Sequence, residues 1–592
     1  MRAQKRKPPP ARPAGTVHNA EVAAAFEEIA DLLAIEDESP FRVRAYRNAA
    51  RVIGELGREV AAMVASGEDL TALPGIGKDL AAKIRELVVT GELDVLRALR
   101  ERTPPALTAL LRLPGLGPKR VRALYATLGV RTVDELRAAA EAKHIREIPG
   151  FGEKTEARIL QALAANEAER GRFPLASVSG DAEALVRWLS AAPSAERVTI
   201  AGSYRRGRET VGDLDILVSA DEDADAVMDR FVSYEAVARV TAEGPTRAAA
   251  VLKSGIAVDV RVVPRASFGA ALHYFTGSKA HNIAVRRMGQ DRGLKINEYG
   301  VFRGEDPIAG DTEESVYASV DLPYIEPELR EDRGELEAAR EGRLPDLVRL
   351  EDLRGDLHAH STATDGRDTV RVMAEAARAR GLTYLAMTEH SRRLRMVHGL
   401  DPAGLRRTCA AIDRLNETLT GIVVLKGIEV DILEDGSLDL PDDVLGELDL
   451  VVGAVHSRFD LPRAAQTERI LRAMDRPSFS ILAHPSARLV QRRAPIDIDM
   501  IRIIRHAKER GCFMELDAQP DRLDLTDVHA RLCRDEGVLV AVSSDAHRAA
   551  DLAGLRFGVI QARRGWLSKS DVLNTRTLPA LKRLLRRTMR QR

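Results

Sequence analysis

The chain of 592 residues is too long for a single hydrophobic core, and its length predicts about three to five domains. Its 89 basic and 89 acidic residues give a formal charge of zero, which excludes a uniformly basic surface but allows a local basic face. Three widely spaced cysteines exclude a disulfide framework and a thiolate zinc ribbon. Neither a signal peptide nor an apolar run long enough for a membrane span is present, so we expect a modular cytoplasmic protein.

Basic runs lie at both ends of the chain, in residues 1–17 and 576–592. We interpret both as solvated tails, and weak DNA-binding arms are the alternative interpretation. Neither run is needed for the chemistry predicted below.

Three turns of the pattern apolar-Pro-Gly-apolar-Gly lie between amphipathic helical patterns, at residues 73–77, 113–117 and 148–152. Their irregular spacing favours separate helix-hairpin-helix elements over a solenoid. We place the first element in a domain at 18–100 and the other two in a domain at 101–175. Glycine permits a positive φ, and the helix that follows each turn offers unpaired N–H groups to a DNA phosphate. We therefore predict DNA binding without base specificity at six glycines: Gly75, Gly77, Gly115, Gly117, Gly150 and Gly152.

A glycine-rich turn follows a predicted strand at residues 198–201. Gly202 and Ser203 let the backbone turn tightly, so that N–H groups and the serine hydroxyl can face a triphosphate. Arg206 is placed to bind the same phosphates. The segment predicts a phosphate-binding turn.

Two acids follow this turn on a second apolar strand and a third lies on a later one. Asp213 and Asp215 stand at i and i+2, so both carboxylates leave the same face, and Asp259 lies in the apolar run 256–263. Carboxylates suit Mg²⁺, and two such ions can stabilise an in-line phosphoryl displacement. The acids therefore predict nucleotidyl transfer, and the alternative is that they are surface acids beside turns.

The pattern Gly-Ser, Arg-Arg-Gly and Asp-x-Asp, with a third Asp on a later strand, resembles the X family of DNA polymerases within the nucleotidyltransferase superfamily. The resemblance implies an α+β palm at residues 176–265 and a nucleotide-contacting subdomain at 266–322. It also implies a role for Asp213, Asp215 and Asp259 as catalytic residues that bind two Mg²⁺ ions.

The segment Tyr-Phe-Thr-Gly-Ser at residues 274–278 and the later Asn-Glu-Tyr-Gly are similar to the part of that family that holds the incoming nucleotide. The resemblance implies that Tyr274 and Phe275 lie against the sugar, that Asn282 bonds the base edge and that Arg286 lies near the templating base. It places Gly277 and Ser278 in the same nucleotide site.

The first hairpin also resembles the domain of X-family enzymes that removes a 5′-deoxyribose phosphate through a lysine Schiff base. Lys83 is at the matching position, and Tyr46 matches a supporting aromatic residue. Arg42 and Asp79 stand where lyase-proficient members carry lysines. We therefore expect weak lyase activity at most, and a solvated helix residue is the alternative interpretation of Lys83.

After a charged segment at 323–351, interpreted as a linker with a short helix, apolar runs alternate with amphipathic helices. This pattern predicts a distorted (β/α)7 barrel at 352–575. The seven runs lie near residues 354–357, 384–388, 422–430, 449–455, 479–483, 512–517 and 538–543.

Nine of the 13 histidines follow residue 350, and six of them lie at the C-terminal ends of these runs, where such barrels carry their active sites. With three acids they make a ligand set that suits a cluster of Zn²⁺, Mn²⁺ or Fe²⁺. The nine predicted ligands are His358, His360, Asp365, His390, Glu429, His456, His484, Asp545 and His547. We interpret the loop or helix residues His398, His506 and His529 as structural.

The motifs Asp-Leu-His-Ala-His-Ser, Thr-Glu-His-Ser, Gly-Ile-Glu-Val, Val-His-Ser, Ala-His-Pro and Ser-Asp-Ala-His resemble the polymerase-and-histidinol-phosphatase (PHP) domain that follows the polymerase in many bacterial X-family enzymes. One departure is Glu389, where the motif usually has Asp before the histidine. The resemblance implies a trinuclear Zn²⁺ or Mn²⁺ site with 3′-5′ exonuclease activity, and leaves open cleavage at abasic sites or of 3′ blocking groups.

Together these features are typical of a bacterial X-family polymerase that fills short gaps in base excision repair and trims 3′ ends. We expect a monomer that binds gapped or nicked DNA and dNTPs and no membrane. One alternative makes the barrel an independent small-molecule phosphatase. Another is a catalytically silent scaffold that binds DNA ends, although a structural role gives no reason to keep three converging carboxylates.

Overall fold

The computed structural model divides into two compact units, residues 1–171 and 172–592. The glycine predicted at position 115 and most of the N-terminal basic run lie outside the described residues. The structure describes residues 17, 19–54, 56, 60–112, 116–168, 171–394 and 397–589.

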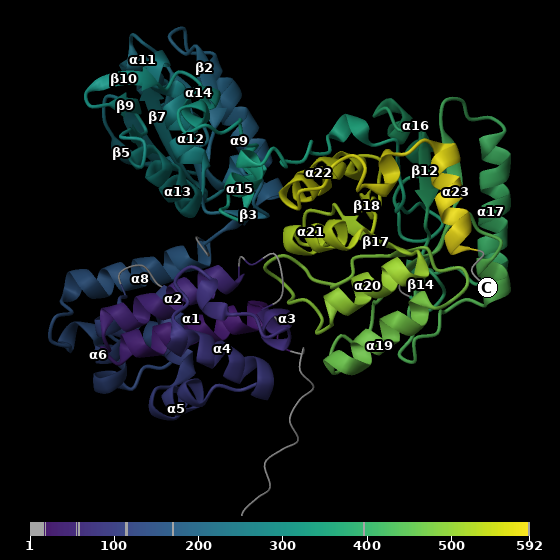
Figure 1. The fold of residues 1–592 in the computed structure, drawn as a ribbon, viewed down its shortest axis with the longest axis horizontal. Coiled ribbons are helices and arrows are strands. Elements are labelled where there is room, and N and C mark those ends of the chain that lie inside the picture. Colours follow the sequence, from purple (N-terminus) through teal and green to yellow (C-terminus); the bar gives the residue numbers. More distant parts are fainter. Residues whose placement is uncertain are drawn as a thin grey trace, which may run out of the picture. The chain divides into compact units, whose positions relative to one another are not determined.

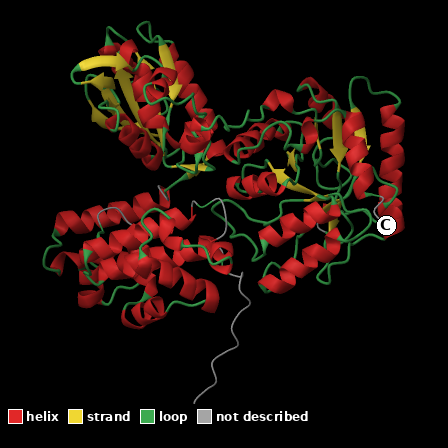
Figure 2. Ribbon diagram, in the orientation of Figure 1, coloured by secondary structure: helices red, strands yellow, loops and turns green. Residues whose placement is uncertain are grey.

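The first unit is helical throughout its described part (Figure 2). Its apolar residues form one core around Phe26 and Tyr46 and a second around Leu124 and Leu136, as the two predicted hairpin regions require. The helices are α1 (Asn19–Ile35), α2 (Pro40–Gly54), α3 (Val60–Ala65), α4 (Lys78–Thr90), α5 (Asp94–Arg102), α6 (Pro118–Leu128), α7 (Val133–Glu141) and α8 (Glu153–Ala168).

The described hairpin turns have the predicted backbone. Gly75 and Gly150 adopt φ values of +75° and +87°, which L side chains rarely adopt. Gly77 and Gly117 are the N-caps of α4 and α6 and have no cap hydrogen bond from a side chain. A Cβ at either position would meet no described atom within 4 Å, so the chain does not crowd the starts of these helices.

In the second unit, residues 172–263 form a five-stranded sheet in the order β2-β4-β7-β6-β5. Helices α9 (Leu175–Ser190) and α11 (Ala224–Val232) pack with the sheet in one apolar cluster. The sheet brings two acid-bearing strands together, because β4 and β7 are parallel neighbours with Asp215 opposite Asp259. The strands are β2 (Arg197–Ile200), β4 (Asp213–Ser219), β5 (Val237–Glu243), β6 (Arg247–Leu252) and β7 (Ala257–Val263).

A second, smaller cluster follows the sheet. It contains α12 (Phe268–Thr276), α13 (Lys279–Gln290), the three-stranded sheet β10-β9-β8 and α14 (Glu313–Ala318). The strands of that sheet are β8 (Lys295–Asn297), β9 (Gly300–Arg303) and β10 (Asp306–Ala309).

The segment 323–351, expected to be a linker with a short helix, does contain one, α15 (Glu335–Arg340). It is more than a spacer, however. Leu329, Leu336 and Leu347 are buried in the apolar core of the preceding subdomain, so the segment is folded onto it.

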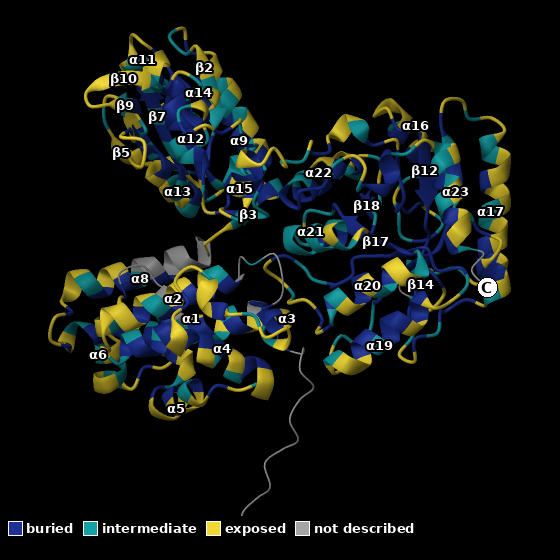
Figure 3. Cartoon of the chain, viewed as in Figure 1, coloured by how far each residue is buried: buried dark blue, intermediate teal, exposed yellow. Residues whose placement is uncertain are grey.

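The barrel consists of parallel strands that alternate with helices and are buried over most of their length (Figures 1 and 3). Its strands form two sheets, β11-β12-β13 and β14-β15-β16-β17-β18. Parallel bridges join the two sheets at Ala359–Ala546 and at His390–Glu429. The strands are β11 (Gly355–Asp356), β12 (Tyr384–Met387), β13 (Val423–Lys426), β14 (Glu429–Asp431), β15 (Val452–Ala454), β16 (Ile481–Leu482), β17 (Phe513–Asp517) and β18 (Val540–Ser543).

One of the seven predicted apolar runs, 422–430, gives two strands, β13 and β14. The break falls at Gly427, where a Cβ would lie 2.9 Å from Thr388 Cγ2 and 3.0 Å from the Met387 carbonyl. The chain therefore passes from one sheet to the other at a point that only glycine fits. The predicted fold class, helical hairpins followed by an α+β palm and a distorted β/α barrel, is confirmed.

The C-terminal segment differs from the expected basic tail. Residues Leu578–Thr588 form helix α23, whose Leu581 and Leu585 are buried in a core of the barrel. The helix is amphipathic, with basic side chains on one face and apolar side chains on the other. The prediction of a tail was wrong because it considered only the charges. Among the described residues, no helix combines the length and apolar character needed to cross a membrane.

Candidate active sites

The glycine-rich turn lies directly on the acid-bearing strand. Residues Gly202–Arg205 form the short helix α10, and a Cβ at Gly202 would lie 2.2 Å from Asp215 Oδ2. The Ala201 N–H donates to the Asp215 carbonyl at 2.7 Å. The sequence folds this way because Gly202 adopts φ +63° and leaves room for the carboxylate.

The three predicted palm acids differ in exposure. Asp213 is exposed, whereas Asp215 and Asp259 are half-buried. Burial, together with the charges of Asp213 and Asp259, raises the pKa of Asp215 to about 6. Crowded carboxylates of this kind fit a bound divalent cation, which would relieve their repulsion.

Asp259, however, is held by arginines. Its Oδ2 accepts hydrogen bonds from Arg247 Nε and Nη2 at 2.9 and 2.7 Å, and Arg261 Nε lies 3.0 Å from its Oδ1. In the part of the chain that the structure describes, the three palm carboxylates are not among the groups of ligand atoms that lie within 4.8 Å of one another.

Arg206 lies beside the turn, as predicted, and its guanidinium is held on two sides. Nη1 donates to the Thr276 carbonyl at 2.7 Å, and Nε donates to Glu331 Oε1 at 3.1 Å. These contacts fix the direction of the Arg206 side chain. Ser203, in the same turn, is half-buried.

The predicted nucleotide-contacting residues surround the end of α12. Tyr274 and Phe275 pack edge to face with their ring centroids 5.1 Å apart. Asn282 Nδ2 donates to the Tyr274 carbonyl at 2.6 Å, and a Cβ at Gly277 would lie 2.3 Å from Asn282 Oδ1. Ser278 caps α13.

Arg286, one turn further along α13, is exposed. Gly277 and Ser278 therefore lie between α12 and α13, and Asn282 and Arg286 lie on α13.

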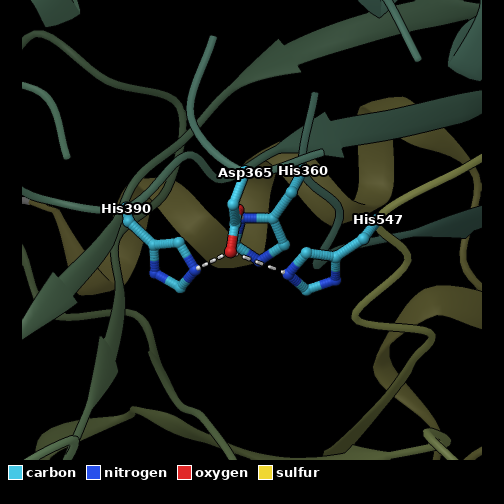
Figure 4. Close-up of side chains that lie close together, drawn as sticks. All are labelled: His360, Asp365, His390 and His547. Atoms are coloured by element: carbon cyan, nitrogen blue, oxygen red, sulfur yellow. Dashed lines mark ion pairs between the residues drawn. The ribbon is translucent and has the colours of Figure 1, made fainter. Parts of the chain in front are cut away.

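In the barrel, all nine predicted ligands come together. Asp365 Oδ2 lies 3.3 Å from His390 Nε2 and 3.3 Å from His547 Nε2, with His360 beside them (Figure 4). His484, on the next strand end, bonds Glu429 at 2.9 Å. Three groups could each hold a metal ion: His360, Asp365, His390 and His547; His358, His360 and Asp545; and His390, Glu429 and His456.

The electrostatics of these groups fit divalent cations. Within the described residues, the buried Nε2 atoms of His358 and His360 have no hydrogen-bond partner. Burial lowers the pKa of His360 to about 4, while Glu429 and Asp365 outweigh burial and raise the pKa of His390 to about 10. Buried imidazoles and carboxylates held this closely suit metal ions, which would replace the protons.

Two supporting acids were missed from the sequence. Glu515 Oε1 lies 2.8 Å from His358 Nδ1, and Asp431 Oδ1 lies 2.7 Å from His456 Nδ1. Such contacts fix the ring orientation of metal-binding histidines. Glu515 lies inside the buried strand β17 and Asp431 ends the buried strand β14. That burial was the available signal, because a buried acid needs a partner.

Glu389, the departure from the motif, turns away from the cluster. Its carboxylate accepts hydrogen bonds from Ser361 Oγ and Thr364 Oγ1, both at 2.5 Å. It thereby supports the loop that carries Asp365. His398, His506 and His529, expected to be structural, are outside the three groups.

Lys83 lies on α4 with its side chain mostly buried, and its Nζ donates a hydrogen bond to Asp79 Oδ1. Burial raises the pKa of the nearby Tyr46, which belongs to the core of the first hairpin region. Asp79 therefore occupies the amine that a Schiff base would require.

Comparison with protein-family models gives five matches along the chain. They are a helix-hairpin-helix domain (residues 17–93), a SAM-like helix-hairpin-helix tandem (107–165), the DNA polymerase beta palm (172–251), the DNA polymerase beta thumb (271–331) and the PHP domain (356–518).

Among curated proteins, a DNA polymerase/3′-5′ exonuclease PolX of Bacillus subtilis is 36% identical over 575 residues, which cover 96% of this chain and 100% of that protein. A probable phosphatase of Acetivibrio thermocellus is 30% identical over 201 residues, 32% of this chain and 78% of that protein. A probable phosphatase of Thermoanaerobacter is 29% identical over 230 residues, 37% and 85% respectively. The chain therefore belongs to the X family of DNA polymerases, in the branch that carries a C-terminal PHP domain.

Proposed function

We propose that this chain is a template-directed DNA polymerase that fills short gaps during base excision repair, and that its barrel trims 3′ ends as a metal-dependent 3′-5′ exonuclease. The observation that carries the proposal is the pairing of β4 with β7, which sets Asp215 opposite Asp259 beside the glycine-rich turn. The full-length similarity to a protein named DNA polymerase/3′-5′ exonuclease supports it.

In the palm, Asp213, Asp215 and Asp259 would hold two Mg²⁺ ions, which supply charge stabilisation for the attacking and leaving oxygens. Asp259 would also assist deprotonation of the primer 3′-OH. For this role, the Asp259 carboxylate must release Arg247 and bind the metal and the primer instead. Arg247 would therefore compete for the carboxylate until substrate binds. Ser203, Arg206 and the backbone of the turn would bind the triphosphate.

Tyr274, Phe275 and Asn282 would hold the sugar and base of the incoming dNTP, and the hairpin glycines would bind phosphates of the gapped duplex. In the barrel, the nine ligands would hold Zn²⁺ or Mn²⁺ ions, and the three groups of ligands fit three such ions. When bound, these ions would activate a water for phosphodiester hydrolysis. Glu515 and Asp431 would orient His358 and His456.

The test is primer extension and primer degradation on a one-nucleotide gapped duplex, with and without dNTPs, in Mg²⁺ and then in Mn²⁺. We expect a product one nucleotide longer with dNTPs, and 3′ shortening with Mn²⁺ when dNTPs are omitted. A primer that lengthens under none of these conditions refutes the polymerase assignment.

A second candidate function for the barrel is small-molecule phosphatase activity, because its relatives include probable phosphatases that match the barrel. Competition separates the two candidates. Gapped DNA should inhibit phosphatase turnover if DNA is the substrate of the barrel, and should leave turnover unchanged if the barrel acts on small phosphate esters.

A further inference from the structure

One barrel helix, α22 (Leu555–Arg564), packs against the palm rather than only against the barrel. Phe557 and Leu523 of the barrel are buried in the apolar cluster of the palm, and Ile560 packs on the same cluster. Gly207 of the phosphate-binding turn adopts φ +63°, and a Cβ there would lie 2.1 Å from Ile560 Cγ2. The turn therefore rests directly on the barrel helix.

The last residue of this helix, Arg564, contacts the same turn through hydrogen bonds. Its side chain is 2% exposed, and its Nη1 donates to the Arg206 carbonyl at 2.7 Å and to Glu331 Oε1 at 3.0 Å. Glu331 Oε1 is also the acceptor for Arg206 Nε. One guanidinium of the barrel thus fixes both the backbone of Arg206 and the acid that directs its side chain.

Arg564 also pairs with a second acid. Arg564 Nη2 and Arg333 Nη1 both donate to Asp527, at 2.8 and 2.9 Å. Glu331 in turn pairs with Arg206, Arg208 and Arg564. Arg564 therefore links the acid that directs Arg206 to the barrel residue Asp527.

We infer that Arg564, a residue of the barrel, is a positioning residue for nucleotidyl transfer in the palm, because it holds Arg206 in the direction needed to bind the triphosphate of a dNTP. The inference rests on the proposed function of the turn. Without Arg564, the Arg206 carbonyl loses a buried donor and Glu331 loses a partner, so the turn would no longer be fixed.

The experiment compares Arg564→Met with Arg556→Met in the full-length protein. Arg556 is a matched control, since it lies on the same helix and also pairs with the palm, at Glu183, but at an exposed site away from the turn. We expect Arg564→Met to raise the KM for dNTP by on the order of tenfold, with the KM for gapped DNA and the exonuclease rate unchanged. Arg556→Met should leave all three unchanged, and Arg564→Lys should recover part of the dNTP affinity.

Arg206→Ala separates the possible failures. If that substitution leaves the KM for dNTP unchanged, the proposed role of the turn is wrong. If Arg206→Ala raises the KM but Arg564→Met does not, the turn binds nucleotide and the inference about Arg564 alone is overturned.

If Arg564→Met unfolds the protein, as shown by thermal unfolding and loss of exonuclease activity, Glu331→Gln decides the question. Positioning requires the KM for dNTP to rise in this variant. A KM that is unchanged or lower would mean that Glu331 only competes with nucleotide for Arg206, and would overturn the inference.

Discussion

The palm and the barrel both carry acids on or next to their strands, but the two proposed metal sites differ in the number and kind of ligands that the chain supplies. The barrel brings nine ligands together, six of them imidazoles, and fixes two of its histidines with buried acids. The palm offers three carboxylates, one exposed and one occupied by Arg247. The comparison indicates that the chain alone supplies the proposed ligands of the barrel site, whereas the proposed palm site would need oxygens of the substrate to complete it.

The difference follows from the neighbours of each site. In the barrel, strands from two sheets end around one point, so ligands approach from several directions. In the palm, two neighbouring strands supply all three acids from one side. We expect the oxygens of a primer and a nucleotide to supply the remaining ligands, which the chain itself does not provide.

The largest expected effect tests whether the two sites are separate. Asp213→Ala should lower primer extension by on the order of 10³-fold, because a metal worth several kcal/mol of transition-state stabilisation is lost, and should spare hydrolysis. His358→Ala should do the reverse. Both rates are measured on the same gapped substrate, and a fall in both activities with either substitution contradicts the two-site comparison.

The next effect concerns the support of the barrel ligands. Glu515→Gln keeps the shape of the side chain but removes the charge next to His358 Nδ1. We expect metal affinity, and exonuclease activity at limiting Mn²⁺, to fall by about 10- to 100-fold. Primer extension in the same preparation is the control and should not change, and excess Mn²⁺ should restore hydrolysis.

A smaller effect should appear in the stability of the metal-free palm. The pKa of Asp215 is raised from 3.8 to about 6, so its ionisation in the folded state costs stability as pH rises through this interval. Asp215→Asn should therefore increase the free energy of unfolding at pH 7.5 by on the order of 1–3 kcal/mol with a chelator present. The gain should vanish near pH 4, and thermal unfolding at both pH values measures it. An equal gain at both pH values would exclude titration of Asp215 as the cause.

The smallest effect is expected for the departure from the family motif. Glu389→Asp shortens a side chain that accepts three hydrogen bonds from Ser361 and Thr364, in the loop before Asp365. Loss of one bond costs about 1 kcal/mol, so exonuclease activity should fall by less than tenfold. Steady-state hydrolysis measures the change, and a loss as large as that of His358→Ala would make Glu389 part of the metal site.

Much of both sites could be predicted from local patterns. The alternation of residues along a strand placed Asp213 and Asp215 on one face, and the position of each histidine after an apolar run placed the barrel ligands. These predictions succeeded because strand direction and side-chain alternation depend on residues close in sequence. The break between the two sheets at Gly427 was not predicted. It depends on the contacts of Gly427 with Met387 and Thr388, which are distant in sequence.

Contacts between distant segments could not be predicted. Arg247 reaches Asp259 from a neighbouring strand, and Arg564 reaches Glu331 across 233 residues of sequence. In the C-terminal helix, the many arginines suggested a solvated tail, although Leu581 and Leu585 have the spacing of a buried helix face. Each case depends on tertiary packing, which overrides what charge and composition indicate locally.

The burial of Phe557 and Leu523 in the palm core has a consequence for synthesis of the protein. The last palm strand ends at Val263, 294 residues before Phe557. At bacterial rates of about 5–20 residues per second, the ribosome needs about 15–60 s to cover that interval. Throughout this time the nascent palm lacks part of its core, so the polymerase half completes its folding only when the barrel is almost finished.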